Sequence, residues 1–153
     1  KLNQLKNTLA QIHCKVISIA VDLSETGAAV HIAETARQQM GGIDVLINNA
    51  GVLDFTRFER QSEARIAQMI HTNTTMPIQL THAIMDDFLA KNQGHIVFVG
   101  SIFGSLGFPY FSTYCASKFA IHGFSQSLRR ELLGTNIGIS YIAPRGIKTA
   151  MND

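Results

Sequence analysis

Hydrophobic residues in this chain fall into short, nearly continuous runs, separated by longer stretches in which apolar positions recur at helical spacing. The short runs are rich in Val and Ile and do not alternate with polar residues, which is typical of strands buried on both faces of a sheet. They predict strands at residues 15–22, 44–48, 95–100 and 137–143. The amphipathic stretches predict helices at residues 26–40, 62–90 and 113–133.

Strands and helices therefore alternate along the chain, which indicates right-handed crossovers and a parallel sheet. We predict an α/β fold, a Rossmann-like doubly wound sheet, in a single domain over residues 1–153. Gly41 and Gly42 are predicted to end the helix that precedes the second strand. A spacing of four residues predicts one apolar stripe on the last helix, made of Ala120, Phe124, Leu128 and Leu132.

The composition is that of a globular protein, with 46% hydrophobic and 16% charged residues. A net charge of +2 with scattered basic residues gives no electrostatic surface for nucleic acid. No apolar run approaches the roughly 20 residues of a membrane-spanning helix. The 2 cysteines and 6 dispersed histidines indicate neither a disulfide framework nor a metal site, and a reducing, cytoplasmic location is predicted.

Unusual residues follow the predicted strands, at the edge where parallel sheets bind ligands. The segment "NNAG", residues 48–51, ends the second strand. Its Ala and Gly leave room for a flat ligand beside the backbone, although Asn and Gly are also common turn formers. Ser101 follows the third strand, and "YCASK" places Tyr114 and Lys118 one helical turn apart on one face.

In order and spacing, NNAG, Asn73, Ser101 and YCASK resemble the short-chain dehydrogenase/reductase family, over essentially all 153 residues. The resemblance implies an NAD(P)-dependent oxidoreductase that interconverts a carbonyl and a secondary alcohol by hydride transfer. It implies that Tyr114 is the general acid/base and that Ser101 and Tyr114 bind the substrate oxygen. It further implies that Lys118 supports Tyr114 and bonds the nicotinamide ribose.

Two of these assignments have a physical reason. A free phenol has a pKa of about 10, and a cation within about 4–6 Å favours the phenolate, so we expect Lys118 to lower the pKa of Tyr114. Asn73 lies four residues before Pro77, which has no N–H, so the Asn73 carbonyl loses its intrahelical partner and the helix should kink. The family's Asn at this position holds a water in a proton relay, which makes Asn73 a catalytic candidate. The alternative is a plain proline kink with a packed Asn.

The resemblance also implies contacts to the cofactor. Asp22 and Leu23, at the end of the first predicted strand, stand where the family meets the adenine, although Asp22 also suits a helix cap. Residues 143–151 resemble the family's Pro-Gly segment, but Arg145 stands where Gly is usual, and Arg does not readily adopt positive φ. The implied cofactor-binding residues are Asp22, Leu23, Asn49, Ala50, Gly51, Tyr114, Lys118, Ile147 and Thr149.

No segment matches the family's glycine-rich phosphate loop, and the chain starts within what looks like the family's second helix. We therefore expect an incomplete fold that lacks the N-terminal strand–helix–strand unit and the C-terminal strand. The strand at 15–22 would then have no neighbour, and the chain as written should neither fold well nor hold a dinucleotide tightly. NADP(H) is preferred to NAD(H) only because reductases of this family often use it.

Apolar residues gather in the loop after the third strand and in the segment after NNAG: Phe103, Leu106, Phe108, Phe111, Phe55 and Phe58. They suggest an apolar small-molecule substrate, such as a lipid-derived, steroid-like or aromatic ketone, unless they pack the loop or a subunit contact. The resemblance implies a homodimer or homotetramer assembled through the helices at 62–90 and 113–133. A non-catalytic NAD(P)-sensing protein is the alternative function, and dehydratases or epimerases are related possibilities that NNAG disfavours.

Overall fold

The computed structural model describes residues 8–9 and 15–145. Its strands are β1 (Val45–Asn48), β2 (Gly94–Val99) and β3 (Ile137–Ile142). Its helices are α2 (Ala28–Met40), α3 (Glu63–Ile70), α4 (Met76–Lys91) and α5 (Ser112–Glu131), with short turns η1 (Phe58–Arg60), η2 (His71–Thr75) and η3 (Ile102–Gly104). The helix expected at the very start of the chain lies largely outside the described residues, as do Ile147 and Thr149.

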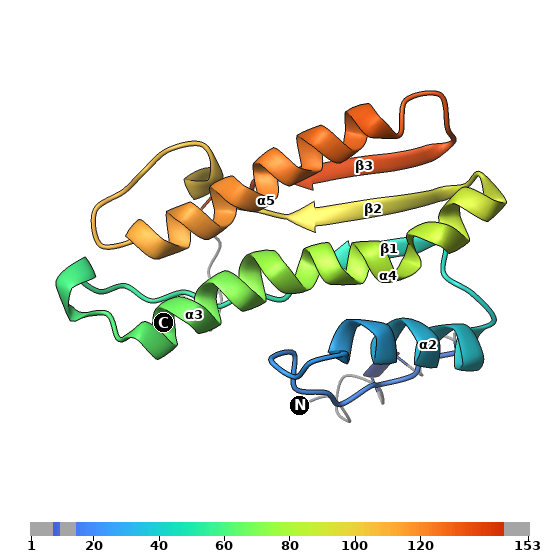
Figure 1. The fold of residues 1–153 in the computed structure, drawn as a ribbon, viewed down its shortest axis with the longest axis horizontal. Coiled ribbons are helices and arrows are strands. Elements are labelled where there is room, and N and C mark those ends of the chain that lie inside the picture. Colours follow the sequence, from blue (N-terminus) through green and yellow to red (C-terminus); the bar gives the residue numbers. More distant parts are fainter. Residues whose placement is uncertain (1–7, 10–14, 146–153) are drawn as a thin grey trace.

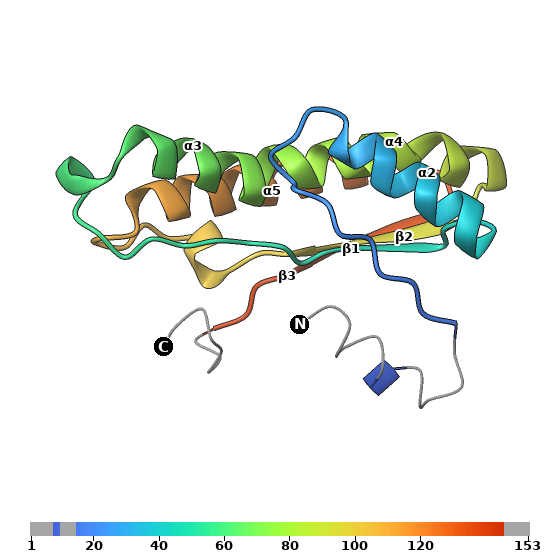
Figure 2. The same cartoon turned by 90° about the horizontal axis from the view of Figure 1, so that it is seen from below.

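The three strands form one parallel sheet in the order β1-β2-β3 (Figure 1). Asn48 pairs with Phe98, and Val99 pairs with Ile142, so all three strands end at the same edge. The described helices α2 to α5 lie together on one face of this sheet (Figure 2). The parallel sheet of a Rossmann-like α/β fold is therefore confirmed, with the strands at 44–48, 95–100 and 137–143 placed to within one residue.

The strand predicted at residues 15–22 is wrong in this structure. The segment is followed by a turn at Asp22–Glu25, but it carries no strand assignment and joins no ladder with the described residues. A run of Val and Ile favours an extended backbone, but a strand also needs a neighbour that accepts and donates the ladder hydrogen bonds. None of the described strands pairs with this segment.

The helix predicted at 62–90 is one long rod built from α3, η2 and α4 (Figure 1). Ser62 caps its start by accepting a hydrogen bond from the Arg65 N–H. The centre of the rod, η2, is a π-helical turn in which the Met76 N–H bonds the His71 carbonyl five residues back. Because Pro77 cannot donate a backbone hydrogen bond, the regular ladder is interrupted just here, as the sequence predicted.

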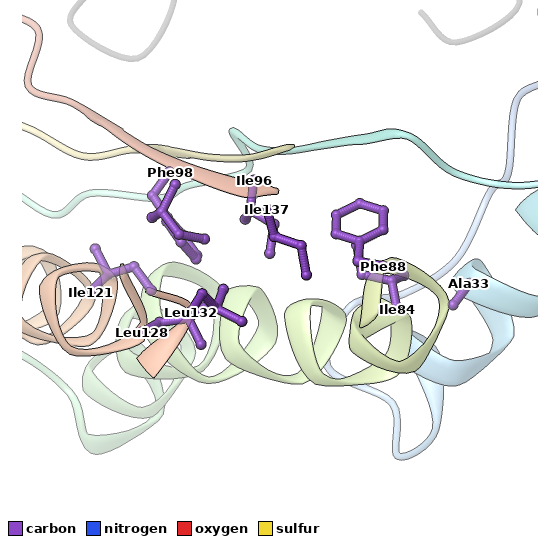
Figure 3. Close-up of a cluster of buried hydrophobic side chains, with 10 residues drawn as sticks. Ala33, Ile84, Phe88, Ile96, Phe98, Ile121, Leu128, Leu132 and Ile137 are labelled. Atoms are coloured by element: carbon purple, nitrogen blue, oxygen red, sulfur yellow. The ribbon is translucent and has the colours of Figure 1, made fainter. Parts of the chain in front are cut away.

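The main core lies between the sheet and helices α4 and α5 (Figure 3). Phe88, Ile96 and Phe98 are at most 1% exposed, and Ile121 of α5 packs with them. The stripe predicted on the last helix is only partly correct, since Leu128 and Leu132 are buried but Ala120 is exposed. The buried face of α5 instead runs through Ser117, Ile121, Ser125 and Leu128, because small serines allow α5 to pack closely.

The predicted glycine stop is confirmed at the end of α2, where Gly41 adopts φ 82° and its N–H bonds the Arg37 carbonyl. This left-handed conformation is the usual glycine termination of a helix. Arg37 also pairs with Asp87 of α4 at 2.7 Å, which joins α2 to the long rod. Within the described part of the chain, no helix has both the length and the apolarity needed to cross a membrane.

Candidate active site

Ser101, Tyr114 and Lys118 meet beyond the carboxyl end of β2. Ser101 follows that strand by two residues, and the first turns of α5 carry Tyr114 and Lys118. The Tyr114 side chain hydrogen-bonds the Ser101 side chain. The Lys118 ammonium donates to the Val99 carbonyl at 3.1 Å and lies 5.7 Å from the centre of the Tyr114 ring. The structure thus brings together the three residues that the sequence proposed.

The Ser101 hydroxyl has a second task in the local fold. It accepts a hydrogen bond from the Phe103 N–H at 3.2 Å and so caps η3. This structural contact does not exclude a catalytic role for Ser101. Because the cap bond uses a lone pair, the hydroxyl proton remains free to be donated to another oxygen.

The pKa of Tyr114 moves in the direction opposite to our expectation. Burial raises the pKa of this phenol, and the hydrogen bond with Ser101 lowers it only in part. Lys118 is not among the groups that shift it, and its ammonium donates to the Val99 carbonyl. The buried phenol therefore keeps its proton at neutral pH, as a proton donor must.

Lys118 is itself perturbed by its surroundings. The side chain is 6% exposed, and burial lowers the pKa of its ammonium to about 8. It lies next to the NNAG segment, since a Cβ placed on Gly51 would be 3.7 Å from the Lys118 Nζ. A lysine with this pKa exchanges its proton near neutral pH, which suits a position behind an acid/base group.

Asn73 binds two segments of the site to each other. From the π-helical turn, its side chain accepts a hydrogen bond from the Val52 N–H at 2.8 Å and donates one to the Val52 carbonyl at 2.8 Å. It also donates to the Ser117 hydroxyl at 3.0 Å. The packed-Asn alternative is thus correct as a description of its side chain. The Asn73 carbonyl, facing a proline four residues on, remains a candidate for holding a water.

Ser117 is a site residue that the sequence analysis missed. It is fully buried, and its backbone carbonyl accepts a hydrogen bond from the Thr74 hydroxyl at 3.0 Å. Together with the bond from Asn73, this fixes the turn of α5 that lies between Tyr114 and Lys118. A serine between these two residues on the buried face of a helix was the available signal.

We predict that Asn73→Ala lowers the free energy of unfolding by about 2–4 kcal/mol, because it leaves both polar groups of Val52 without their partner. Urea denaturation at neutral pH measures this difference. Asn136→Ala, at an exposed position, is the matched control and should change stability by about 0.5 kcal/mol or less. Equal values for the two variants would show that the Asn73 contacts do not hold the site together.

Three of the implied cofactor residues line one cavity of about 60 Å³: Leu23, Asn49 and Ala50. Leu23 is held there because its carbonyl contacts the His71 ring Nε2 at 2.8 Å. Asp22 is exposed, and its carboxylate accepts hydrogen bonds from the backbone and hydroxyl of Ser24, which lower its pKa. Asp22 thus caps its own turn, whereas the residue at the N-cap of α2 is Gly27.

The departure from the family pattern at Arg145 is accommodated without unusual backbone. Arg145 is exposed and is not among the described non-glycine residues with positive φ, which are Asn92 and Tyr110. The preceding residue, Pro144, accepts a hydrogen bond from the Ile102 N–H at 3.2 Å, which ties this segment to the active-site loop. The predictions for Ile147 and Thr149 lie outside the described residues.

The aromatic residues of the loop form a continuous cluster of contacting rings that reaches Tyr114. The ring centres of Phe103 and Phe111 lie 4.9 Å apart. They lie 6.3 and 6.1 Å, respectively, from the centre of the Tyr114 ring. Phe55 and Phe108 extend the cluster outward and are 63% and 50% exposed. Phe58 is also exposed. Among the described residues, no cluster of three or more His, Cys, Asp or Glu side chains could hold a metal ion.

The chain is similar to known proteins in sequence. A family model described as short chain dehydrogenase matches residues 1–153. The chain is 30% identical over 153 residues to Nodulation protein G of Rhizobium sp., covering 62% of that protein. It is 32% identical over 143 residues, 94% of the chain, to Ketoacyl reductase HetN of Nostoc sp., of which it covers 50%.

Two solved structures are also similar in fold. One is a metagenomic short-chain oxidoreductase in complex with NADP, with TM-score 0.88 and 28% identity, over 94% of this chain and 65% of that one. The other is a short-chain dehydrogenase/reductase from Burkholderia phymatum in complex with NAD, with TM-score 0.90 and 26% identity, over 95% and 53%. The chain thus spans between half and two thirds of the length of these relatives.

Proposed function

The chain belongs to the short-chain dehydrogenase family, and from this premise we propose that it forms part of an NAD(P)-dependent oxidoreductase acting on a carbonyl or a secondary alcohol. One observation carries the proposal: a buried phenol, a serine hydroxyl and a buried lysine converge at the carboxyl end of a parallel strand. This is the edge at which such sheets bind dinucleotides. A relative named Ketoacyl reductase supports carbonyl chemistry.

The proposed chemistry follows from the protonation of these groups. A nicotinamide cofactor, when bound, supplies or accepts the hydride. Because burial raises its pKa, Tyr114 is protonated at neutral pH and donates its proton to the carbonyl oxygen during reduction. The Ser101 hydroxyl donates a second hydrogen bond to that oxygen and fixes its position. Lys118, with a pKa of about 8, returns a proton toward Tyr114.

The residues present fit a dinucleotide, as the space around Gly51 indicates. Gly51 is not among the glycines with positive φ, so its backbone does not require glycine. A Cβ at this position would touch Asn73 Oδ1 at 3.4 Å and Lys118 Nζ at 3.7 Å, which are ordinary contacts. The protein's own packing therefore tolerates a side chain here. We infer that Gly51 serves the close approach of a ligand to the backbone.

The expected result of Gly51→Ala is a folded protein with weakened cofactor binding. The added methyl group fits the free protein but occupies the space of the ligand, so we expect nicotinamide cofactor affinity to fall about tenfold or more, with a melting temperature near that of the wild type. Isothermal titration with NADP and NAD measures the affinity. Gly123→Ala on the exposed face of α5 is the control, and equal affinities for the two variants would contradict this role of Gly51.

The aromatic cluster supports an apolar substrate. Phe103 and Phe111 contact the ring of the proposed proton donor, and Phe55 and Phe108 expose aromatic surface beside them. A ketone whose carbonyl reaches Tyr114 would lay its body along these rings. We therefore propose an aromatic, steroid-like or lipid-derived ketone in preference to a small polar one.

Two finer assignments concern the cofactor and the assembly. We propose NADP(H) ahead of NAD(H) because reductases of this family often use it, and one solved relative is a complex with NADP while another is a complex with NAD. We also propose a homodimer or homotetramer, because the long rod and α5 expose large apolar side chains, Leu89 and Phe119. Both assignments are proposals for the whole protein.

The deciding experiment is cofactor oxidation by the full-length protein against a panel of polar, aliphatic, steroid and aromatic ketones, with NADPH and NADH in parallel. The proposal predicts turnover with at least one apolar ketone. Binding of a nicotinamide without turnover on any ketone or alcohol would favour the NAD(P)-sensing alternative. Failure of both cofactors to bind would overturn the proposal altogether.

A further inference from the structure

Tyr141 of β3 reaches across the sheet edge to the backbone of Ser101. Its hydroxyl oxygen lies 3.4 Å from the Ser101 nitrogen, which donates to it, and 3.4 Å from the Ser101 carbonyl oxygen, which accepts from it. One phenol thus bridges both backbone polar groups of the residue whose side chain binds Tyr114. The contact joins residues that are 40 positions apart in the chain.

The Tyr141 ring also packs against a neighbouring aromatic ring. It stacks on the His122 ring with centres 4.4 Å apart and planes at 22°. The His122 Nδ1 in turn contacts the Gly104 carbonyl at 3.1 Å, and so connects α5 to η3. The phenol therefore sits between β3, α5 and the loop that carries Ser101.

Two glycines create the space for this phenol. A Cβ on Gly100 would lie 2.1 Å from both Cζ and the hydroxyl oxygen of Tyr141, and a Cβ on Gly104 would lie 2.3 Å from that oxygen. Neither glycine has a positive φ, so the backbone conformation does not demand glycine at either place. The two glycines lie on either side of Ser101 in the sequence. Their lack of a side chain leaves the volume that the Tyr141 phenol occupies.

We propose that Tyr141 is a positioning residue for Ser101, which it orients through its backbone so that the Ser101 hydroxyl meets Tyr114 and the substrate oxygen. The proposal rests on the function proposed above. Burial raises the pKa of Tyr141, so the phenol stays protonated and can donate and accept at the same time. A residue that only filled space would need the ring, but not the hydroxyl.

Tyr141→Phe separates these roles, because it removes the hydroxyl and keeps the ring against His122, Gly100 and Gly104. In the full-length enzyme we expect kcat for ketone reduction to fall roughly 10- to 100-fold, with a smaller change in KM and a nearly unchanged melting temperature. The control is Ser140→Ala, which removes the neighbouring hydroxyl that contacts the His95 Nε2 at 2.8 Å. Adjacent strand residues face opposite sides of a sheet, so this control should leave kcat unchanged.

The pH dependence of ketone reduction distinguishes a positioning role of Tyr141 from a purely structural one, which would leave the apparent pKa unchanged. The bond from Ser101 lowers the pKa of Tyr114 in part, so a displaced Ser101 should shift the apparent pKa of ketone reduction upward in Tyr141→Phe. If kcat and the pH profile of Tyr141→Phe match those of Ser140→Ala, the positioning role is overturned.

Amide hydrogen exchange tests the same contact without any turnover, and so distinguishes failure of this inference from failure of the proposed function. The Ser101 amide should exchange about tenfold faster or more in Tyr141→Phe, because it loses its acceptor. The Gly100 amide is the internal reference, since it bonds the Ile142 carbonyl at 2.8 Å and should keep its protection. Unchanged exchange at Ser101 would overturn the inference even in an active enzyme.

Discussion

Replacing Tyr114 with Phe is expected to lower kcat for ketone reduction by about 100- to 10,000-fold, the usual contribution of a general acid. The substitution removes only the hydroxyl that bonds Ser101 and keeps the ring packed against Phe103 and Phe111. The fold should therefore persist, and cofactor affinity should change little. Steady-state kinetics with the best ketone of the panel, combined with a binding titration, measures both quantities.

Tyr110→Phe is the matched control for this prediction. Tyr110 lies near the site, with its ring 5.3 Å from that of Phe55, but its hydroxyl makes no hydrogen bond to the part of the chain that the structure describes. The control should retain wild-type kcat. Retention of full activity by Tyr114→Phe would exclude the phenol as the proton donor, and the mechanism proposed here would be wrong.

Much of the fold follows from local patterns in the sequence. The three described strands are continuous Val- and Ile-rich runs, and Gly41 ends α2 where a glycine stop was predicted. The π-helical turn also has a local cause, since Pro77 cannot donate its hydrogen bond. The segment 15–22 shows the limit of such reasoning, because a strand depends on partners that its own residues do not specify.

The sequence predicted which residues form the candidate site, but it did not predict all of their contacts or pKa values. Spacing and strand ends brought together Ser101, Tyr114 and Lys118, which lie close to one another in the structure. The direction of the Tyr114 pKa was mispredicted, because one-turn spacing does not reveal burial, and burial is the largest influence on the pKa of this phenol. Ser117 lies inside the YCASK motif, but its hydrogen-bonded contacts with η2 are set by the tertiary fold and could not be predicted from the motif.

The contact between Tyr141 and Ser101 illustrates the same point from another direction. A glycine before Ser101 reads as an ordinary loop residue when only its neighbours in sequence are considered. In the structure, Gly100 is the space into which the Tyr141 phenol fits. Non-local complementarity of this kind becomes visible only in three dimensions, because Tyr141 pairs with Phe98 in the sheet and its phenol extends past the end of β2 to the backbone of Ser101.

Lys118→Met is expected to affect activity and cofactor binding together. The substitution keeps a chain of similar length but removes the ammonium that bonds Val99 and lies beside Gly51. Loss of one charged hydrogen bond to the cofactor should weaken nicotinamide affinity about 10- to 100-fold, and kcat should fall because Tyr114 loses its proton source. Lys91→Met, at the exposed ion pair with Asp44, is the control and should change neither quantity.

The wild type and Lys118→Met together test whether Lys118 is buried as the structure shows. Burial lowers its pKa to about 8 from 10.5, so between these values the unfolded chain binds more protons than the folded one. Wild-type stability should therefore rise with pH across this window relative to Lys118→Met, by at most about 1.4 kcal/mol per pH unit. Below about pH 8 the wild type carries the full cost of a buried charge, and the relative stability should be constant.

Urea denaturation of both proteins at about pH 7 and about pH 10 measures this difference. A gap in unfolding free energy that stays constant over the two conditions would mean that Lys118 is solvated in the free protein. Activity lost without loss of cofactor affinity would restrict Lys118 to the support of Tyr114, since a lysine that also binds the ribose must change both. Retention of both activity and cofactor affinity would show that Lys118 has no role in the active site.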